Sequence, residues 1–194
     1  LSAELKRELE SFEGNAQAFR LIFSLLRLNL TYSQSAAVLK YTRCGTEPKP
    51  SDENPLNYLK KKVGYYWSEQ SDIEKMQHHL DIQPGHRYPL AYLMEAADDI
   101  SYCLADIEDG VEKGLIDCER LATELNDTFE QLAADDYCSE FLNGKSFKKA
   151  LVYALSRSQN EPINKAHEFF VWLRVQLIHP LVEHAADSFI EHMD

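Results

Sequence analysis

The chain has 194 residues, 44% of them hydrophobic and 11% aromatic, which is enough to bury a substantial core. Its 32 acidic and 20 basic residues give a formal net charge of −12, so the overall field repels nucleic acid and anionic membranes. No run approaches the roughly 18 apolar residues of a membrane span, and no signal peptide is visible.

The chain begins at Leu1 without Met, directly inside a helical pattern of apolar residues at Leu5, Leu9 and Phe12, so we expect it to be cut from something longer. A second, amphipathic helix is expected to begin near Gly14 or Asn15, and Thr31 is expected to cap a short third helix. Residues 44–57 contain a glycine and three prolines and are predicted to be a loop. The only candidate strand is residues 63–67.

Two helices are predicted in the middle of the chain. Residues 71–74 have the form of a capping box and are expected to open a helix that ends near Leu80. A long central helix is predicted from about Pro89 to Lys113, with Gly114 as the glycine just beyond its end.

Three more helices are predicted in the last third of the chain. Asp117 is expected to cap a helix through Leu132, and another is expected over residues 146–156. The last helix should begin after Pro162, and Pro180 should kink or divide it. Strand patterns are scarce, so the fold class is predicted to be all-α, with residues 1–194 forming a single helical domain.

The cysteines indicate the cellular compartment. None of them has C-x-x-C spacing, so we expect reduced thiols in a cytoplasmic protein rather than a zinc site. These residues are Cys44, Cys103, Cys118 and Cys138.

The central helix sorts its residues onto two faces. Asp98, Tyr102 and Asp106 are spaced four apart, with Glu95 and Asp109 near them. Such a row is either hydrated surface, the commoner arrangement, or it faces a cleft where carboxylates bind magnesium or manganese. The opposite face is an apolar stripe formed by Leu93, Ala97, Ile100, Leu104, Ile107 and Val111.

Basic residues concentrate between positions 40 and 62, which is a local reversal of charge in an acidic chain. Lysine acts as a point charge on phosphate oxygens, so this segment could bind a polyphosphate. The alternative is an exposed loop with ordinary surface lysines. The basic residues are Lys40, Arg43, Lys49, Lys60, Lys61 and Lys62, and Tyr41, Tyr58, Tyr65 and Tyr66 are interleaved with them.

Several segments in the right order resemble the middle of bacterial deoxyguanosine triphosphate triphosphohydrolases, which belong to the HD-domain superfamily. The likeness is strongest over Met94–Tyr102, good over residues 2–113, and looser beyond. The other segments that carry it are Phe12–Gln17, Leu28–Thr31, Leu39–Arg43, Lys61–Tyr66, Tyr88–Leu90 and Phe169–Val175.

The resemblance implies a helical, HD-domain-like fold and a metal-dependent hydrolase that converts dGTP to deoxyguanosine and tripolyphosphate. It implies that Asp98 is the last ligand of a divalent metal, Mg²⁺ or Mn²⁺, and that Tyr102 and Asp106 face the deoxyribose. Lys40, Tyr41 and Lys62 would approach the triphosphate by the same comparison. Family members commonly form homo-oligomers, and some respond to single-stranded nucleic acid.

The chain departs from the family pattern at the metal site. The family's histidine and His-Asp dipeptide lie upstream of the Phe12–Gln17 segment and are absent here. One carboxylate cannot hold a catalytic metal in a defined geometry, so this chain alone is expected to be inactive and to lack the metal. The rival hypothesis is a non-catalytic helical module that regulates or binds a partner.

Overall fold

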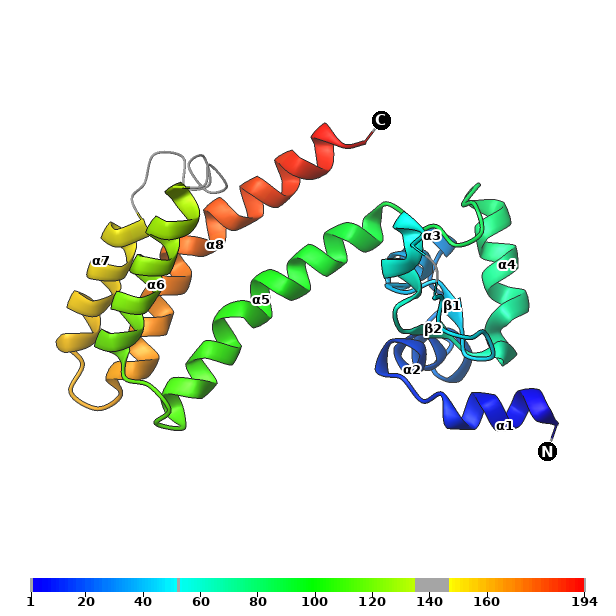
Figure 1. The fold of residues 1–194 in the computed structure, drawn as a ribbon, viewed down its shortest axis with the longest axis horizontal. Coiled ribbons are helices and arrows are strands. Elements are labelled where there is room, and N and C mark those ends of the chain that lie inside the picture. Colours follow the sequence, from blue (N-terminus) through cyan, green and yellow to red (C-terminus); the bar gives the residue numbers. More distant parts are fainter. Residues whose placement is uncertain (1, 52, 135–146, 194) are drawn as a thin grey trace. The chain divides into compact units, whose positions relative to one another are not determined.

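The structure is a computed structural model that describes residues 2–51, 53–134 and 147–193. Backbone contacts divide the chain into two compact units, Leu1–Glu95 and Ala96–Asp194. Helices dominate both units, which confirms the all-α class (Figure 1). The single-domain organisation stays a prediction.

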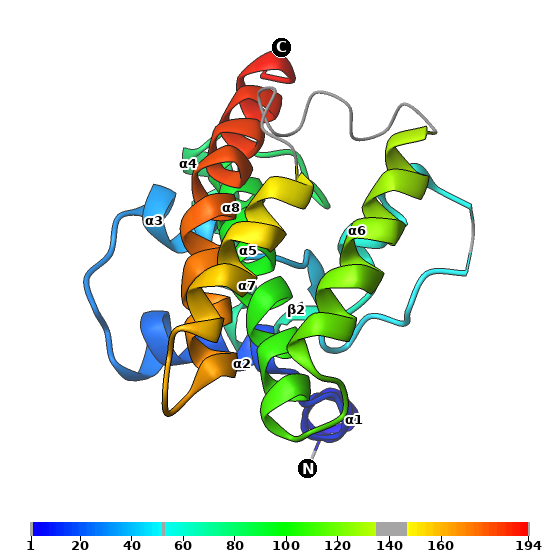
Figure 2. The same ribbon diagram turned by 90° about the vertical axis from the view of Figure 1, so that its left-hand side faces the viewer.

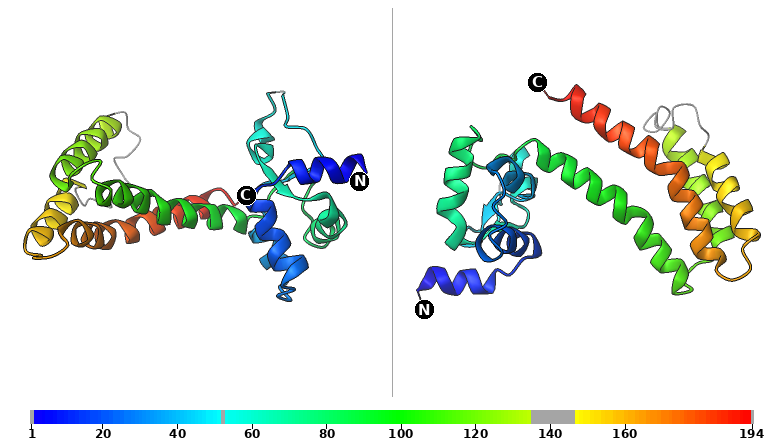
Figure 3. Two further views of the ribbon diagram at one scale, coloured as in Figure 1. Left: turned by 90° about the horizontal axis from the view of Figure 1, so that it is seen from below. Right: turned by 180° about the vertical axis from the view of Figure 1, so that it is seen from behind.

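Short helices and two very short strands make up the first unit. In chain order they are α1 (Ala3–Glu10), α2 (Gly14–Arg20), the π-helix η1 (Leu21–Leu25), α3 (Tyr32–Ala37), β1 (Arg43–Cys44), the 3₁₀-helix η2 (Pro55–Lys60), β2 (Val63–Tyr65), the 3₁₀-helix η3 (Trp67–Glu69) and α4 (Gln70–His79). Helix α2 packs against β2 and α3 against α4. Figure 3 shows the helices of this unit from two further sides. The buried core of this unit includes Phe19, Ile73 and Met76.

The predicted starts of α2 and α3 are confirmed. Helix α2 begins at Gly14, and Thr31 caps α3 by accepting a hydrogen bond from the backbone N–H of Gln34. The capping box predicted over residues 71–74 is wrong. Helix α4 already begins at Gln70, because the 3₁₀-helix η3 runs directly into it.

The two strands pair in parallel, and a glycine permits their approach. Arg43 aligns with Val63, and Cys44 with Tyr65. A Cβ atom on Gly64 would lie 1.6 Å from the carbonyl oxygen of Tyr41, so any larger residue would collide with the main chain. The expected strand is therefore present but shorter than predicted, and its partner β1 was missed.

The second unit begins within the long helix α5 (Leu90–Glu112) and continues with α6 (Cys118–Ala134), α7 (Phe147–Gln159) and α8 (Lys165–Glu191). Gly114 ends the α5 segment with a φ of +71°, and the Asp117 side chain accepts from the N–H of Arg120 at 2.9 Å. Both predicted boundaries are confirmed. Residue 146, the predicted start of α7, lies outside the described residues.

A proline lies inside α8. Of the two predicted outcomes, a kink or a division, the division does not occur, because helix α8 continues through Pro180. Pro180 is buried, so packing holds the helix together where a backbone hydrogen bond is lost.

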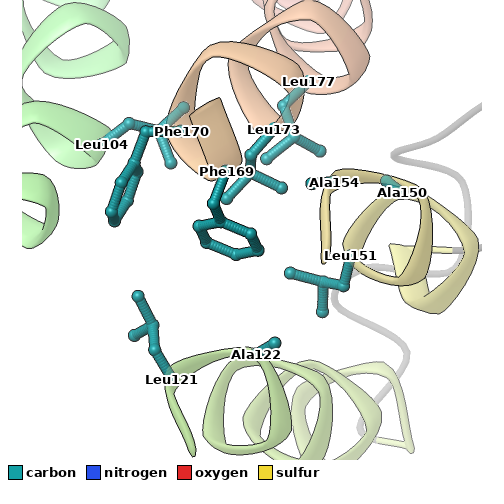
Figure 4. Close-up of a cluster of buried hydrophobic side chains, with 10 residues drawn as sticks. All are labelled: Leu104, Leu121, Ala122, Ala150, Leu151, Ala154, Phe169, Phe170, Leu173 and Leu177. Atoms are coloured by element: carbon teal, nitrogen blue, oxygen red, sulfur yellow. The ribbon is translucent and has the colours of Figure 1, made fainter. Parts of the chain in front are cut away.

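Side chains from α6, α7 and α8 interdigitate to form the core of the second unit. Figure 2 shows α7 and α8 running side by side, and the two helices contact each other extensively. Phe169, fully buried, points into the space between α6 and α7 in Figure 4, and Leu104 brings α5 into the same cluster. No helix in the described ranges is both long and apolar enough to span a membrane.

The cysteines described in the structure are all free thiols. Cys44 is buried, Cys118 is half-buried and Cys103 is exposed. Cys138 lies outside the described residues. Burial raises the pKa of the Cys118 thiol, and the neighbouring acidic residues raise it further, so this thiol stays protonated.

Candidate functional site

The acidic face of α5 is exposed in the second unit. Asp98, Tyr102 and Asp106 lie one turn apart along the helix, and 61% of the Tyr102 surface is accessible. Leu104 is buried, so the two-faced pattern holds over this part of the helix. Ala97 departs from it, because it is exposed although it belongs to the predicted apolar stripe.

A complete metal site is not found among the residues that the structure describes. No group of three or more histidine, cysteine, aspartate or glutamate residues in residues 2–51, 53–134 and 147–193 could hold a metal ion. A divalent cation needs several converging oxygen or nitrogen ligands. The residues present therefore do not fit a resident metal by themselves, and Asp98 could contribute only one ligand of a larger set.

The predicted triphosphate-binding residues lie in the first unit, and two of them are in contact. The Lys62 ammonium lies 5.9 Å from the centroid of the Tyr41 ring, within the range of a cation–π interaction. The same ammonium lies 3.8 Å from the carboxylate of Glu13. Glu13 also caps α2 by accepting from the N–H of Asn15 at 2.7 Å, so it links Lys62 to the start of that helix.

Arg87 organises the surroundings of Lys40. Its Nε donates to the carbonyl oxygen of Lys40, and its Nη1 pairs with Glu95. The Lys40 ammonium lies 3.3 Å from the other oxygen of Glu95. The Arg87 side chain is only 1% exposed, and a buried cation is retained when it is fully paired, as here.

Three tyrosine rings surround the Arg87 guanidinium. The centroid of Tyr92 lies 5.1 Å away, that of Tyr58 5.6 Å and that of Tyr41 5.9 Å. The hydroxyls of Tyr58 and Tyr92 are 3.1 Å apart and share a hydrogen bond. Burial raises the pKa of Tyr92 to about 12, and the hydrogen bond with Tyr58 adds to the shift.

The segment that carries Lys40 and Tyr41 is fixed by the residues that follow it. The N–H of Thr42 donates to the carbonyl oxygen of Leu59 at 2.9 Å, and its hydroxyl donates to the carbonyl of Gly85 at 3.2 Å. Arg43, predicted only as part of a basic cluster, instead donates to the carbonyl oxygens of Lys60 and Glu47. Its role is therefore structural.

A second buried ion cluster anchors the N-terminal helices. Arg20 pairs with Glu8 at 2.7 Å and with Glu69 at 2.9 Å, and its guanidinium lies 4.2 Å from the ring centroid of Tyr66. Burial alone would lower the pKa of Arg20, but the hydrogen bonds to both glutamates outweigh it, and the pKa is raised. The arginine thus stays charged and ties α1, α2 and η3 together.

Sequence reasoning missed Arg87, the most connected residue of the basic cluster. Nothing in its local sequence marks an arginine as buried, because its partners come from positions 40, 41, 58, 92 and 95. One signal was available. Glu95 interrupts an apolar region beside Asp98, and a half-buried carboxylate requires a cationic partner.

Relatives of known name match this chain from end to end. A probable deoxyguanosinetriphosphate triphosphohydrolase of Pseudomonas aeruginosa is 49% identical over 195 residues, which is 100% of this chain and 39% of the relative. The chain is homologous to part of the deoxyguanosinetriphosphate triphosphohydrolases. The resemblance drawn from the motifs is confirmed.

Further members of this family agree. Deoxyguanosinetriphosphate triphosphohydrolases of Yersinia pestis and Yersinia enterocolitica are each 40% identical over all of this chain, which is 37% of their own length. The chain therefore spans well under half the length of the curated relatives that it matches. No family model matches the chain.

Proposed function

We propose that this chain is part of a longer dGTP triphosphohydrolase that converts dGTP to deoxyguanosine and tripolyphosphate. The observation that carries the proposal is 49% identity over the whole chain to a protein named for this activity. The proposal includes an HD-type site with a divalent metal, Mg²⁺ or Mn²⁺, and a cytoplasmic homo-oligomer that could also bind single-stranded nucleic acid.

The roles of individual residues follow from the family resemblance and are compatible with the geometry. Asp98 would supply one carboxylate to the metal, which activates the attacked α-phosphate when it is bound. Tyr102 and Asp106, one and two turns further along α5, would contact the deoxyribose. An aspartate accepts a hydrogen bond from a sugar hydroxyl, and an aromatic ring can close against a sugar that lacks a 2′-hydroxyl.

The basic residues of the first unit would bind the triphosphate. Lys40, Tyr41 and Lys62 supply two ammonium groups and a phenol, and these neutralise charge that accumulates on the leaving tripolyphosphate. The support is the contact of Lys62 with Tyr41 and the arginine network that fixes Lys40. An ordinary surface loop would not need a buried arginine to hold its main chain.

The isolated chain is expected to be inactive, since no complete set of metal ligands lies among the residues described. The test uses the full-length protein and this chain side by side, each with dGTP and Mg²⁺ or Mn²⁺. The full-length protein should release deoxyguanosine and tripolyphosphate in equal amounts, as read by chromatography and ³¹P NMR. Stoichiometric turnover by the chain alone would refute the inactivity.

A non-catalytic helical module remains the second candidate, because the chain on its own lacks the His-Asp dipeptide of the family. The reading frame upstream of position 1 separates the two. A histidine followed by a His-Asp dipeptide in that region would support the enzyme, and the lack of both would support the module.

A further inference from the structure

The side chains of Arg87 and Glu95 contact Lys40 at its main chain and at its ammonium group. Arg87 donates to its main-chain carbonyl, and Glu95 pairs with its ammonium at 3.3 Å. Arg87 and Glu95 also pair with each other, so the three residues form a closed set of contacts. This arrangement restrains both the backbone and the charged tip of one lysine.

Lysine needs such restraint to bind phosphate well. Its ammonium is a point charge on a flexible four-carbon stem, and ordering that stem opposes binding. A carboxylate that already holds the ammonium in one position removes part of this cost before the ligand arrives. The Arg87 side chain lies against tyrosine rings and is only 1% exposed, so it is too buried to contact a ligand in solvent.

Glu95 also links this network to the helix of the acidic face. It lies in α5 three residues before Asp98, and its carboxylate pairs with the Lys40 ammonium. Tyr41, the next residue along that segment, packs its ring 5.9 Å from the Arg87 guanidinium. The contacts of Arg87 therefore extend to two of the three predicted triphosphate-binding residues.

We propose that Arg87 and Glu95 are positioning residues for triphosphate binding: Glu95 acts through Lys40, Arg87 acts through Lys40 and Tyr41, and neither touches the substrate. The proposal rests on the proposed function. It assigns to this pair a share of the affinity for the polyphosphate part of the ligand and no share of the affinity for the nucleoside.

The test uses the full-length enzyme and two separate inhibitors, inorganic tripolyphosphate and deoxyguanosine. Glu95→Ala should raise the KM for dGTP and the inhibition constant of tripolyphosphate about tenfold, a typical effect of losing one positioned charge contact. The inhibition constant of deoxyguanosine should stay within about twofold of the wild type. A residue needed only for folding would weaken both inhibitors together.

A double-mutant cycle shows whether Glu95 acts through Lys40. In a Lys40→Ala background, Glu95→Ala should have no further effect on tripolyphosphate inhibition, because the group that it positions is gone. Arg87→Lys should behave like Arg87→Ala, since one ammonium cannot reproduce the two-pronged contact of a guanidinium. Glu124→Ala, which breaks an exposed arginine–glutamate pair at 2.8 Å in α6, is the control and should change neither inhibitor.

Melting temperatures identify variants that fail to fold, and Glu95→Gln, which keeps the shape and removes the charge, then replaces Glu95→Ala. The proposal is overturned if Glu95→Ala weakens both inhibitors equally, tightens tripolyphosphate, or adds to the effect of Lys40→Ala. Failure of the proposed function is seen separately, as a wild-type enzyme that releases no tripolyphosphate from dGTP.

Discussion

The basic cluster of the first unit and the acidic row of the second unit are built in different ways. Lys40 is held by a buried arginine and a glutamate, and Lys62 contacts both Tyr41 and Glu13. The acidic row on α5 is exposed, and the helical repeat aligns its side chains on one face. The contrast teaches that one set of candidate ligand contacts is fixed by tertiary packing and the other by local structure.

This difference predicts different sensitivities to mutation. The basic cluster should respond to changes at residues that touch no ligand, such as Gly64 and Arg87. The acidic row should tolerate everything except changes in its own side chains or the loss of the core beneath α5.

Phe169→Ala should cause the largest loss of stability, about 3–5 kcal/mol, because it empties a fully buried ring site in the second unit. Each unit contains one tryptophan, Trp67 in the first and Trp172 in the second. In a Trp67→Phe background the fluorescence reports on Trp172 and the second unit, and in a Trp172→Phe background it reports on Trp67 and the first unit. Phe169→Ala should lower the denaturation midpoint more when Trp172 is the reporter.

The matched control is Val175→Ala, at an exposed position of the same helix, which should change stability by about 0.5 kcal/mol or less. A Phe169→Ala shift below about 1 kcal/mol would show that this cluster is not the core of the second unit.

Gly64→Ala should destabilise the first unit by at least about 3 kcal/mol, since its Cβ would overlap the main-chain carbonyl of Tyr41. Gly110→Ala is the opposite case, because nothing lies within 4 Å of a Cβ at that position of α5. It should stabilise the helix by about 0.5–1 kcal/mol. Equal effects in chemical denaturation would contradict the close approach of the two strands.

Local signals predicted the helices well, and long-range contacts escaped prediction. Thr31, Gly114 and Asp117 act on backbone groups within a few residues, so their sequence context is sufficient to place helix ends. Strand β1 is two residues long and pairs across about twenty positions, which leaves no periodic pattern. Arg87 likewise depends on partners from distant segments.

The acidic row on α5 also shows what helical periodicity can and cannot predict. The spacing of Asp98, Tyr102 and Asp106 placed them on one helix face, and the exposure of that face agrees with the prediction. Periodicity carries no information about what approaches an exposed face. Their roles in the site came from family resemblance alone, and they stay predictions.

Thr31→Ala should cost about 1 kcal/mol, because it removes the capping hydrogen bond of α3, the helix that precedes Lys40. Thr31→Ser, which keeps the hydroxyl, should recover most of the loss. Thermal melts of the three proteins measure both effects, and equal melting temperatures for wild type and Thr31→Ala would rule out a stabilising cap.

The smallest effect concerns alkaline pH. The pKa of Tyr92 in the folded chain, about 12, lies above the ordinary value of 10, so folding favours the protonated phenol. The contribution of Tyr92 to stability is therefore complete below pH 10 and is lost as pH rises toward 12. Tyr92→Phe should be less sensitive than wild type in denaturation curves between these pH values, and identical slopes would contradict the hydrogen bond with Tyr58.

Tripolyphosphate release by the full-length protein and its Asp98→Ala and Asp99→Ala variants is the most direct test of the central claim. Both aspartates are exposed neighbours on α5, so the pair separates a metal ligand from a surface charge. If Asp98 is a metal ligand, Asp98→Ala should lower kcat/KM for dGTP at least about 100-fold, and Asp99→Ala should stay within a few-fold of wild type. Equal activity of the two variants, or no tripolyphosphate from the wild type, would contradict the account.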